Sequence, residues 1–234
     1  MSFQVSLKIM GGNFMEKKIF LILGDYYHAH DLAYQAIVKA SAMATEGTSQ
    51  SVELIDSSIE NLEEALNQNV DLVVLYKENR VNPTDEVVYN WMTPKIEAKI
   101  LEYVNRGGSW LAWHNGMASY PETGEYSNML RGYFLHHPSE NKNVKYFAKE
   151  NDVGISLEKS FEAMDEHYFV QCNAQKDSVF LSSESVDGKC EAGWAHEFGT
   201  GRVCCLTPTH REEGMTNEGM LQILSDCVKW CCKI

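Results

Sequence analysis

Short apolar runs that alternate with helical segments constrain the fold of this chain more than any other feature of its sequence. Four of them read KIFLIL, SVELI, VDLVVLY and SWLAW, at residues 18–23, 51–55, 70–76 and 109–113. Such runs are typical of strands that are buried on both faces, as in a parallel sheet. The segments between them have helical spacing, at residues 31–44, 57–67 and 93–105. The alternation predicts an α/β fold in three layers, a mostly parallel sheet with helices on both faces.

The second half of the chain has a different pattern. Residues 120–165 are rich in turn-forming residues and predict an irregular insertion. Later segments predict further strands, at residues 169–172, 179–185, 191–197 and 203–207, before a closing helix at 217–232. We find no linker or repeat, so a single domain over residues 17–234 is expected. Residues 1–16 are expected to be an N-terminal extension.

The charge and the cysteines limit the partners and the compartment. There are 20 basic and 33 acidic residues, for a net charge of −13, which argues against binding to nucleic acid or to anionic membranes. No apolar run is long enough to span a bilayer. Seven cysteines, with two adjacent pairs at 204–205 and 231–232, do not form a disulfide framework. A reducing compartment is the simpler interpretation, and a cytoplasmic protein is expected.

Histidines concentrate at the predicted strand ends. His28 and His30 follow the first strand, His114 follows the fourth, and His210 follows the last. Ligands of an open parallel sheet bind outside the carboxyl ends of its strands, so these side chains are expected on one rim. Imidazoles there act as general acids or bases, or as metal ligands. Taken singly, each is equally well explained as a solvated loop residue or as a buried ring bonded to a carbonyl.

The segment GGSWLAWHNG at residues 107–116 carries the most information. A strand that turns sharply into a helix is the layout of a nucleophile elbow. His114 occupies the elbow position, with Trp113 and Asn115 beside it. The turn would aim His114 into the cleft and present helix N-terminal N–H groups to a polar ligand.

Further motifs in the same order make the sequence resemble a known family. They are FLHHP at 134–138, DEHY at 165–168 and WAHEFGTGRV at 194–203, followed by His210. Together with the segment at 107–114, they resemble the ThuA-like family, a branch of the class I glutamine amidotransferase-like superfamily. The resemblance implies a flavodoxin-like sheet and a role in the utilisation of trehalose or a related disaccharide. Amidotransferases of that superfamily have cysteine where this chain has His114, so glutamine amidotransferase activity is not expected.

The family resemblance, together with the number and position of the histidines, indicates a set of site residues. Those expected in catalysis are His114, Glu166, His167 and His210. Those expected to bind a divalent metal such as zinc are His30, His114, His137, His196 and His210. Those expected to contact the substrate are Trp113, Asn115 and Trp194, although core packing is the alternative for the tryptophans.

Two functions remain open from the sequence. The first is an enzyme, a hydrolase or other sugar-processing enzyme, that acts on a sugar or oxidised sugar in a histidine-rich, metal-binding cleft. The second is a non-catalytic sugar-binding or regulatory protein on the same fold, favoured by the absence of the cysteine. The partner expected in both cases is a sugar-like small molecule. The oligomeric state is open, with a homo-oligomer as one alternative.

Overall fold

The fold was determined as a computed structural model that describes residues 4–5, 15–68 and 70–234. The strands are β1 Gln4–Val5, β2 Met15–Leu23, β3 Gln50–Ser57, β4 Leu72–Tyr76, β5 Ser109–Trp113, β6 Gly132–His136, β7 Lys142–Ala148, β8 Phe161–Asp165, β9 Phe169–Cys172, β10 Val179–Ser185, β11 Gly188–Phe198 and β12 Gly201–Leu206. The α-helices are α1 His30–Thr45, α2 Leu62–Asn67, α3 Pro94–Asn105, α4 Glu125–Leu130, α5 Glu212–Met215 and α6 Glu218–Cys232. Three 3₁₀ turns complete the elements: η1 Ile59–Asn61, η2 His114–Met117 and η3 Lys176–Ser178.

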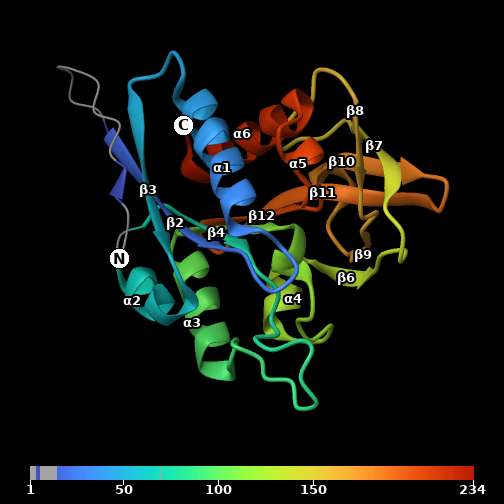
Figure 1. Cartoon of the computed structure of the whole chain (residues 1–234). Coiled ribbons are helices and arrows are strands. Elements are labelled where there is room, and N and C mark those ends of the chain that lie inside the picture. The colour runs from blue at the N-terminus through green and yellow to red at the C-terminus, as the bar shows by residue number, and fades with distance from the viewer. Residues whose placement is uncertain (1–3, 6–14, 69) are drawn as a thin grey trace.

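Ten strands form the main sheet, in the order β1-β3-β2-β4-β5-β12-β11-β10-β7-β8 (Figure 1). Its centre, from β3 to β12, is parallel, and antiparallel strands extend it on both sides. β6 and β9 form a separate antiparallel pair. The α/β architecture predicted from the alternation of apolar runs and helical segments is therefore confirmed.

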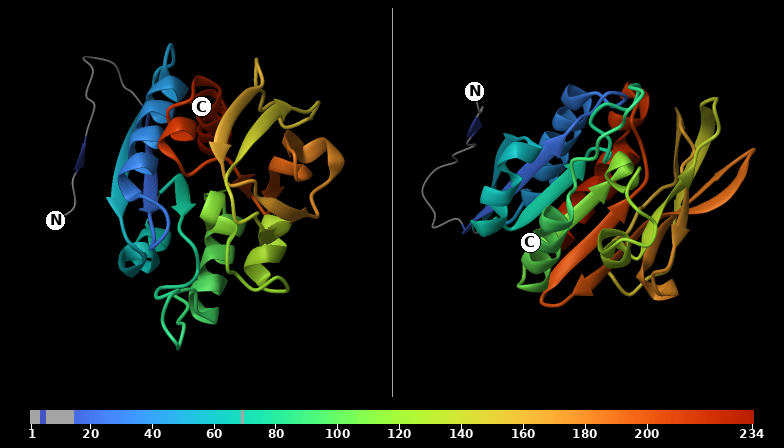
Figure 2. Two further views of the ribbon diagram at one scale, coloured as in Figure 1. Left: turned by 45° about the vertical axis from the view of Figure 1, so that its right-hand side comes forward. Right: turned by 90° about the horizontal axis from the view of Figure 1, so that it is seen from below.

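Side chains that alternate along each central strand enter two different cores. On β2, Ile19 and Leu21 lie in the core beneath α1 and α6, whereas Phe20 and Ile22 lie in the core beneath α2, α3 and α4. Because both faces are covered, these strands need apolar residues at every position. This arrangement explains the unbroken runs in the sequence, and Figure 2 shows the sheet between its helical layers.

Two helices, α3 and α6, begin at residues whose side chains cap them. Thr93 precedes α3, and its hydroxyl accepts a hydrogen bond from the backbone N–H of Ile96 at 3.3 Å, while Pro94 occupies the first turn. Asn217 caps α6 in the same way through Gly219 N–H, at 2.9 Å. A side-chain acceptor and an early proline are both common at helix starts. None of the helices in the described part of the chain is long and apolar enough to cross a membrane.

The prediction of an irregular insertion over residues 120–165 is wrong. This region contains α4, β6, β7 and β8, and β7 and β8 continue the main sheet beyond β10. The strands were missed because they are exposed on one face. In β8, buried Phe161, Ala163 and Asp165 alternate with exposed Glu162 and Met164.

The boundary expected at residue 17 also differs from the structure. β2 begins at Met15, and Gln4 and Val5 pair with β3 through Ile55 and Leu54. Part of the expected extension therefore belongs to the sheet. The rest of the expected extension, residues 1–3 and 6–14, lies outside the described residues.

Candidate functional site

The carboxyl ends of the parallel strands meet at one edge of the sheet, where side chains from distant segments converge. The loop after β2 brings His28, the turn after β5 brings His114, and the loop after β12 brings His210. Glu166 comes from the residue directly after β8 and His137 from the residue directly after β6. We call these five residues the histidine cluster.

His114 is the centre of the cluster. Its backbone has a φ of 48°, which is rare for a residue other than glycine. Its side chain is fully buried, and its Nδ1–H donates to the carbonyl oxygen of Thr207 at 2.6 Å. The Nε2 lone pair therefore remains free and lies 3.6 Å from Glu166 Oε2. Burial lowers the pKa of His114, so the ring is neutral near pH 7.

His28 is oriented by a buried carboxylate. Its Nδ1 lies 2.6 Å from Asp25 Oδ1, while Asp25 Oδ2 accepts from the Glu78 backbone N–H and from Asn115 Nδ2. Burial alone would raise the pKa of Asp25, but the hydrogen bond and charge of His28 outweigh it, and the pKa is lowered. An ionised Asp25 keeps the proton of His28 on Nδ1, which leaves its Nε2 free for a ligand.

His210 has a similar partner on the other side of the cluster. Its Nδ1 lies 2.5 Å from Asp165 Oδ1, and Asp165 Oδ2 accepts from the backbone N–H groups of His210 and Arg211. Despite the opposing effect of burial, contact with His210 lowers the pKa of Asp165 to about 2. Burial would lower the pKa of His210, but Asp165 outweighs it and the pKa is raised.

Glu166 joins the histidines. Its Oε2 lies 3.6 Å from His114 Nε2 and 3.9 Å from His210 Nδ1, and its Oε1 lies 3.7 Å from His137 Nε2. Burial opposes the ionisation of Glu166. Its contacts with imidazoles, of which that with His114 has the largest effect, outweigh burial and lower its pKa to about 2. His137 Nδ1 lies 2.8 Å from the carbonyl oxygen of Pro138, so its Nε2 is also available.

The geometry fits a divalent metal. Donor atoms of His28, His114 and Glu166 all lie within 4.8 Å of one another. Among the described residues, His114 Nε2 and Glu166 Oε2 are buried and have no hydrogen-bond partner, which is costly unless a ligand satisfies them. Two imidazoles and a carboxylate, with each Nδ1 held by an acceptor, are typical of zinc sites.

An aromatic ring covers the cluster. Tyr168 is buried and stacks on His114 with 3.8 Å between the ring centroids, and its ring is also parallel to that of His137 at 5.9 Å. The ring of Tyr76 is also nearly parallel to that of His114, with 6.0 Å between the ring centroids. Both tyrosines are buried and the His114 side chain has no exposed surface, so water is excluded from its ring.

Three histidines expected at the site lie outside the cluster. His30 contacts Asp31 and Asp56 through its two ring nitrogens. His167 is held between the hydroxyls of Ser183 and Ser185, at 2.9 and 2.7 Å. His196 Nε2 donates to the carbonyl of Met129 at 3.0 Å, inside the core. The structure does not bring these three together with His114, so it does not support them as metal ligands or catalytic groups.

The residues expected to contact the substrate are also buried. Trp113 Nε1 donates to the Pro208 carbonyl at 2.5 Å, and Trp194 Nε1 donates to the Leu130 carbonyl at 2.7 Å. Both indoles have no exposed surface, so they pack in the core and do not stack on a ligand. Asn115 is equally buried and binds Asp25 through Nδ2. Asn115 thus helps to hold Asp25, the carboxylate that orients His28.

Sequence reasoning gave too little weight to His28 and missed two orienting carboxylates. Asp25 and His28 are separated by three positions just after a buried strand, and Asp165 directly precedes Glu166. The spacing of Asp25 and His28 could have predicted their contact, because both residues lie in the loop where the first strand ends. The pairing of Asp165 with His210 spans 45 positions, and no local pattern predicts it.

Comparison with known proteins agrees with the fold and the motifs. The family model ThuA, described as trehalose utilisation, matches residues 8–231. A protein described as ThuA-like from Bacteroides uniformis superposes with a TM-score of 0.67 at 16% identity, covering 97% of this chain and 95% of its own. A second, from Parabacteroides merdae, gives 0.67 at 13% identity, covering 93% and 90%.

A third structure of the same fold is a cytoplasmic protein from Salmonella typhimurium, with a TM-score of 0.59 at 14% identity and coverage of 92% and 98%. No curated protein matches the sequence. At these identities the structures show the common fold alone, whereas the family model matches nearly the whole chain. The chain therefore belongs to the ThuA (trehalose utilisation) family.

Proposed function

We propose that the protein is a metal-dependent enzyme that acts on a sugar or an oxidised sugar, with the histidine cluster as its metal centre. The observation that carries the proposal is the convergence of His28, His114 and Glu166, whose donor atoms lie within 4.8 Å of one another. The family description, trehalose utilisation, supports a sugar as substrate. A bound divalent metal would act as a Lewis acid on a carbonyl or hydroxyl oxygen.

The protein side chains would bind the metal, transfer protons and exclude water. Glu166, ionised because its pKa is about 2, and neutral His114 provide donors without first losing a proton. His210 is the candidate general acid or base, because it is partly exposed at 18% and Asp165 raises its pKa. Tyr168 excludes water from the face of His114 on which it stacks.

Elemental analysis of protein purified without a histidine tag tests the metal centre. We expect about one divalent ion per chain in the wild type, and its loss in His114→Ala and in Glu166→Gln. His30→Ala is the matched control, since His30 contacts carboxylates in the same way but lies outside the cluster. It should retain the ion. Wild-type protein that takes up no metal even when zinc is added would contradict the metal centre.

Turnover tests the enzymatic part separately. Trehalose and its oxidised, carbonyl-containing derivatives are incubated with the protein before and after chelation, and again after zinc is restored. We expect turnover of at least one of these sugars that is lost with the metal and returns with it. A protein that binds metal stoichiometrically but converts none of them would contradict the enzyme proposal and leave a binding protein.

We also propose a cytoplasmic location. The seven cysteines are all unpaired, as expected in a reducing compartment, and the Salmonella protein of the same fold is named as cytoplasmic. Fractionation of cells that produce the protein should recover it with a cytoplasmic marker enzyme, and recovery in a secreted fraction would contradict this location.

A further inference from the structure

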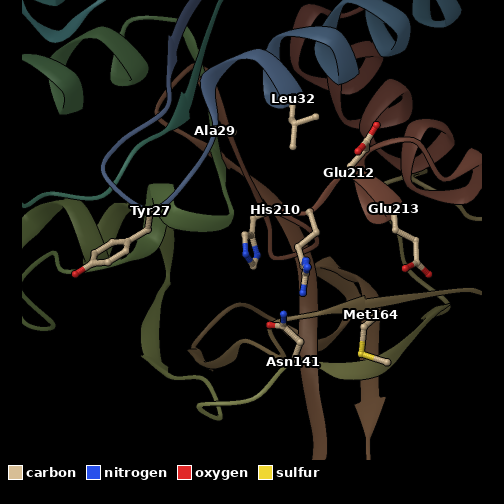
Figure 3. Close-up of a pocket in the computed structure, with 9 residues that line it drawn as sticks. Tyr27, Ala29, Leu32, Asn141, Met164, His210, Glu212 and Glu213 are labelled. Carbon is tan, nitrogen blue, oxygen red and sulfur yellow. The ribbon is translucent and has the colours of Figure 1, made fainter.

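A cavity of about 570 Å³ opens beside the histidine cluster, and His210 is the residue that the two share. The loop before α1, the segment before β7, β8 and the chain around α5 contribute its lining. In Figure 3, Asn141 and Met164 lie below His210, and Glu212 and Glu213 lie to its right. The volume is within the range of about 300–1,000 Å³ that is usual for small-molecule sites.

Four polar side chains of this lining make no hydrogen bond or ion pair within the described part of the chain. The side chains of Asn141, Arg211, Glu212 and Glu213 line the cavity, and among the described residues none of them has a hydrogen-bond or ion-pair partner. Arg211, Glu212 and Glu213 are exposed. Amide, guanidinium and carboxylate groups that are free in this way can bind several hydroxyl groups of one ligand.

Apolar surface accompanies these groups. Tyr27 and Met164 expose 52% and 43% of their surface, and Leu32 packs at the cavity wall. A mixture of apolar surface and a few convergent polar groups is usual for ligand sites. It also matches a sugar ring, which carries C–H faces between its hydroxyls.

The charges restrict the ligand further. Glu212 and Glu213 outnumber Arg211 in the lining, and any positive charge on His210 is offset by ionised Asp165 and Glu166, which lie just beyond it. Carboxylates accept hydrogen bonds from hydroxyl groups, but they repel a phosphate or a second carboxylate. A ligand in this cavity therefore experiences a field that favours neutral molecules over anionic ones.

We infer that this cavity is a binding subsite for an uncharged, polyhydroxylated ligand, and that Glu212 and Glu213 make it discriminate against phosphorylated sugars. The inference rests on the proposed function for its placement, because His210 connects the subsite to the reacting centre. A disaccharide would then place one ring in the cavity and direct the other to the histidine cluster.

Isothermal titration calorimetry tests the subsite, with trehalose as the neutral probe and trehalose 6-phosphate as its charged counterpart. It is carried out on zinc-treated wild-type protein and on metal-free His114→Ala protein, so that binding of the phosphate to a metal is separated from binding in the cavity. We expect saturable binding of trehalose, and binding of the phosphate that is at least about tenfold weaker at low ionic strength. The difference should narrow as salt is added, because these carboxylates are exposed and screened. Equal or tighter binding of the phosphate, or no binding of either sugar, would overturn the inference.

Variants separate the subsite from general charge effects. The double variant Glu212→Gln and Glu213→Gln should narrow the discrimination to about threefold or less. Glu46→Gln, at the far end of α1 from the cavity, should leave the discrimination unchanged. The matched double control adds Glu122→Gln, at an exposed residue between η2 and α4 that does not line the cavity, and should also leave it unchanged. An unchanged preference in the cavity variant would overturn the role of the two glutamates.

Failure of the subsite and failure of the proposed function give different results. If trehalose binds with the expected preference to His114→Ala protein, the subsite stands even when metal content and turnover are lost. If metal binds and turnover occurs but the phosphate is not discriminated against, the proposed function stands and the subsite is overturned.

Discussion

The orientation of single imidazoles decides what the cluster can bind. The Nδ1 atoms of His28 and His210 face the carboxylates of Asp25 and Asp165, and those of His114 and His137 face backbone carbonyls. With the Nδ1 proton held in this way, the lone pair of each ring in its neutral form lies on Nε2. The site is thus built from one tautomer, and the residues that hold it matter as much as the ligands.

Replacement of Asp25 by asparagine should therefore weaken metal binding. Both oxygens of Asp25 accept hydrogen bonds, Oδ1 from the Tyr27 N–H and from His28, and Oδ2 from the Glu78 N–H. The NH₂ group of an asparagine would therefore face a donor in either orientation. We expect the dissociation constant for zinc to rise about 10- to 100-fold. Competition with a chromophoric chelator measures it.

Asp56→Asn is the matched control for that measurement. Asp56 contacts His30 Nε2 at 3.0 Å, so it is also a carboxylate–imidazole pair, but it lies outside the cluster. Its zinc affinity should equal that of the wild type. If Asp25→Asn binds zinc as tightly as Asp56→Asn, the orienting role of Asp25 is wrong.

At the scale of elements, the turn from β5 into η2 positions the site. His114 takes a positive φ there, and two residues later Gly116 packs against β4. A Cβ atom on Gly116 would lie 2.2 Å from the carbonyl oxygen of Leu75. Only glycine allows the turn to approach the strand this closely, so the position of His114 depends on a residue outside the histidine cluster.

Substitution of Gly116 by alanine should damage both stability and the site. The turn must move away from β4, and we expect a loss of about 1–3 kcal/mol in the free energy of unfolding together with weaker zinc binding. Chemical denaturation and chelator competition measure the two effects.

Gly154→Ala provides the comparison. Gly154 has a positive φ, of 80°, and nothing lies within 4 Å of its added Cβ. It should cost about 1 kcal/mol through backbone strain alone and leave zinc affinity unchanged. Equal zinc affinity in the two variants would show that the packing of η2 on β4 does not position His114.

At the scale of the whole molecule, two cores separated by one sheet hold the fold together, and one buried histidine makes its stability depend on pH. His196 is 6% exposed, its Nε2 donates to Met129, and its Nδ1 has no partner among the described residues. Burial, helped by the charge of Arg131, lowers its pKa to about 4. The folded protein therefore keeps this ring neutral where the unfolded chain protonates it.

The sign of the pH effect follows from that difference. Between pH 6.5 and about 4, the unfolded state binds a proton that the folded state does not, so stability falls as the pH falls. At about 1.4 kcal/mol for each pH unit, His196 alone accounts for a loss of about 3 kcal/mol over this range. His196→Gln keeps a donor for the Met129 carbonyl but does not titrate. In this variant, the free energy of unfolding measured with urea should decrease between pH 6.5 and 4 by about 3 kcal/mol less than in the wild type. The same decrease in both proteins would assign the effect to other groups.

The sequence by itself determined the central architecture and the general place of the site. Continuous apolar runs are typical of strands that are covered on both faces, so residues 18–23 and 109–113 predicted β2 and β5. Placing His114 and His210 at carboxyl strand ends was enough to predict a common rim, because parallel strands end at one edge. The motif at 165–168 contributed Glu166 for the same site.

Only the tertiary structure decided which of these groups meet. Three histidines that were expected at the site but lie outside the cluster, His30, His167 and His196, have the same chemistry as its members, and only the surrounding chain gives them other partners. Trp113 and Trp194 gave no sequence signal that separates core packing from ligand contact. Asp165 reaches His210 only because β8 folds back beside the loop after β12. Local spacing predicts contacts within an element, whereas contacts between distant segments depend on how the whole sheet is assembled.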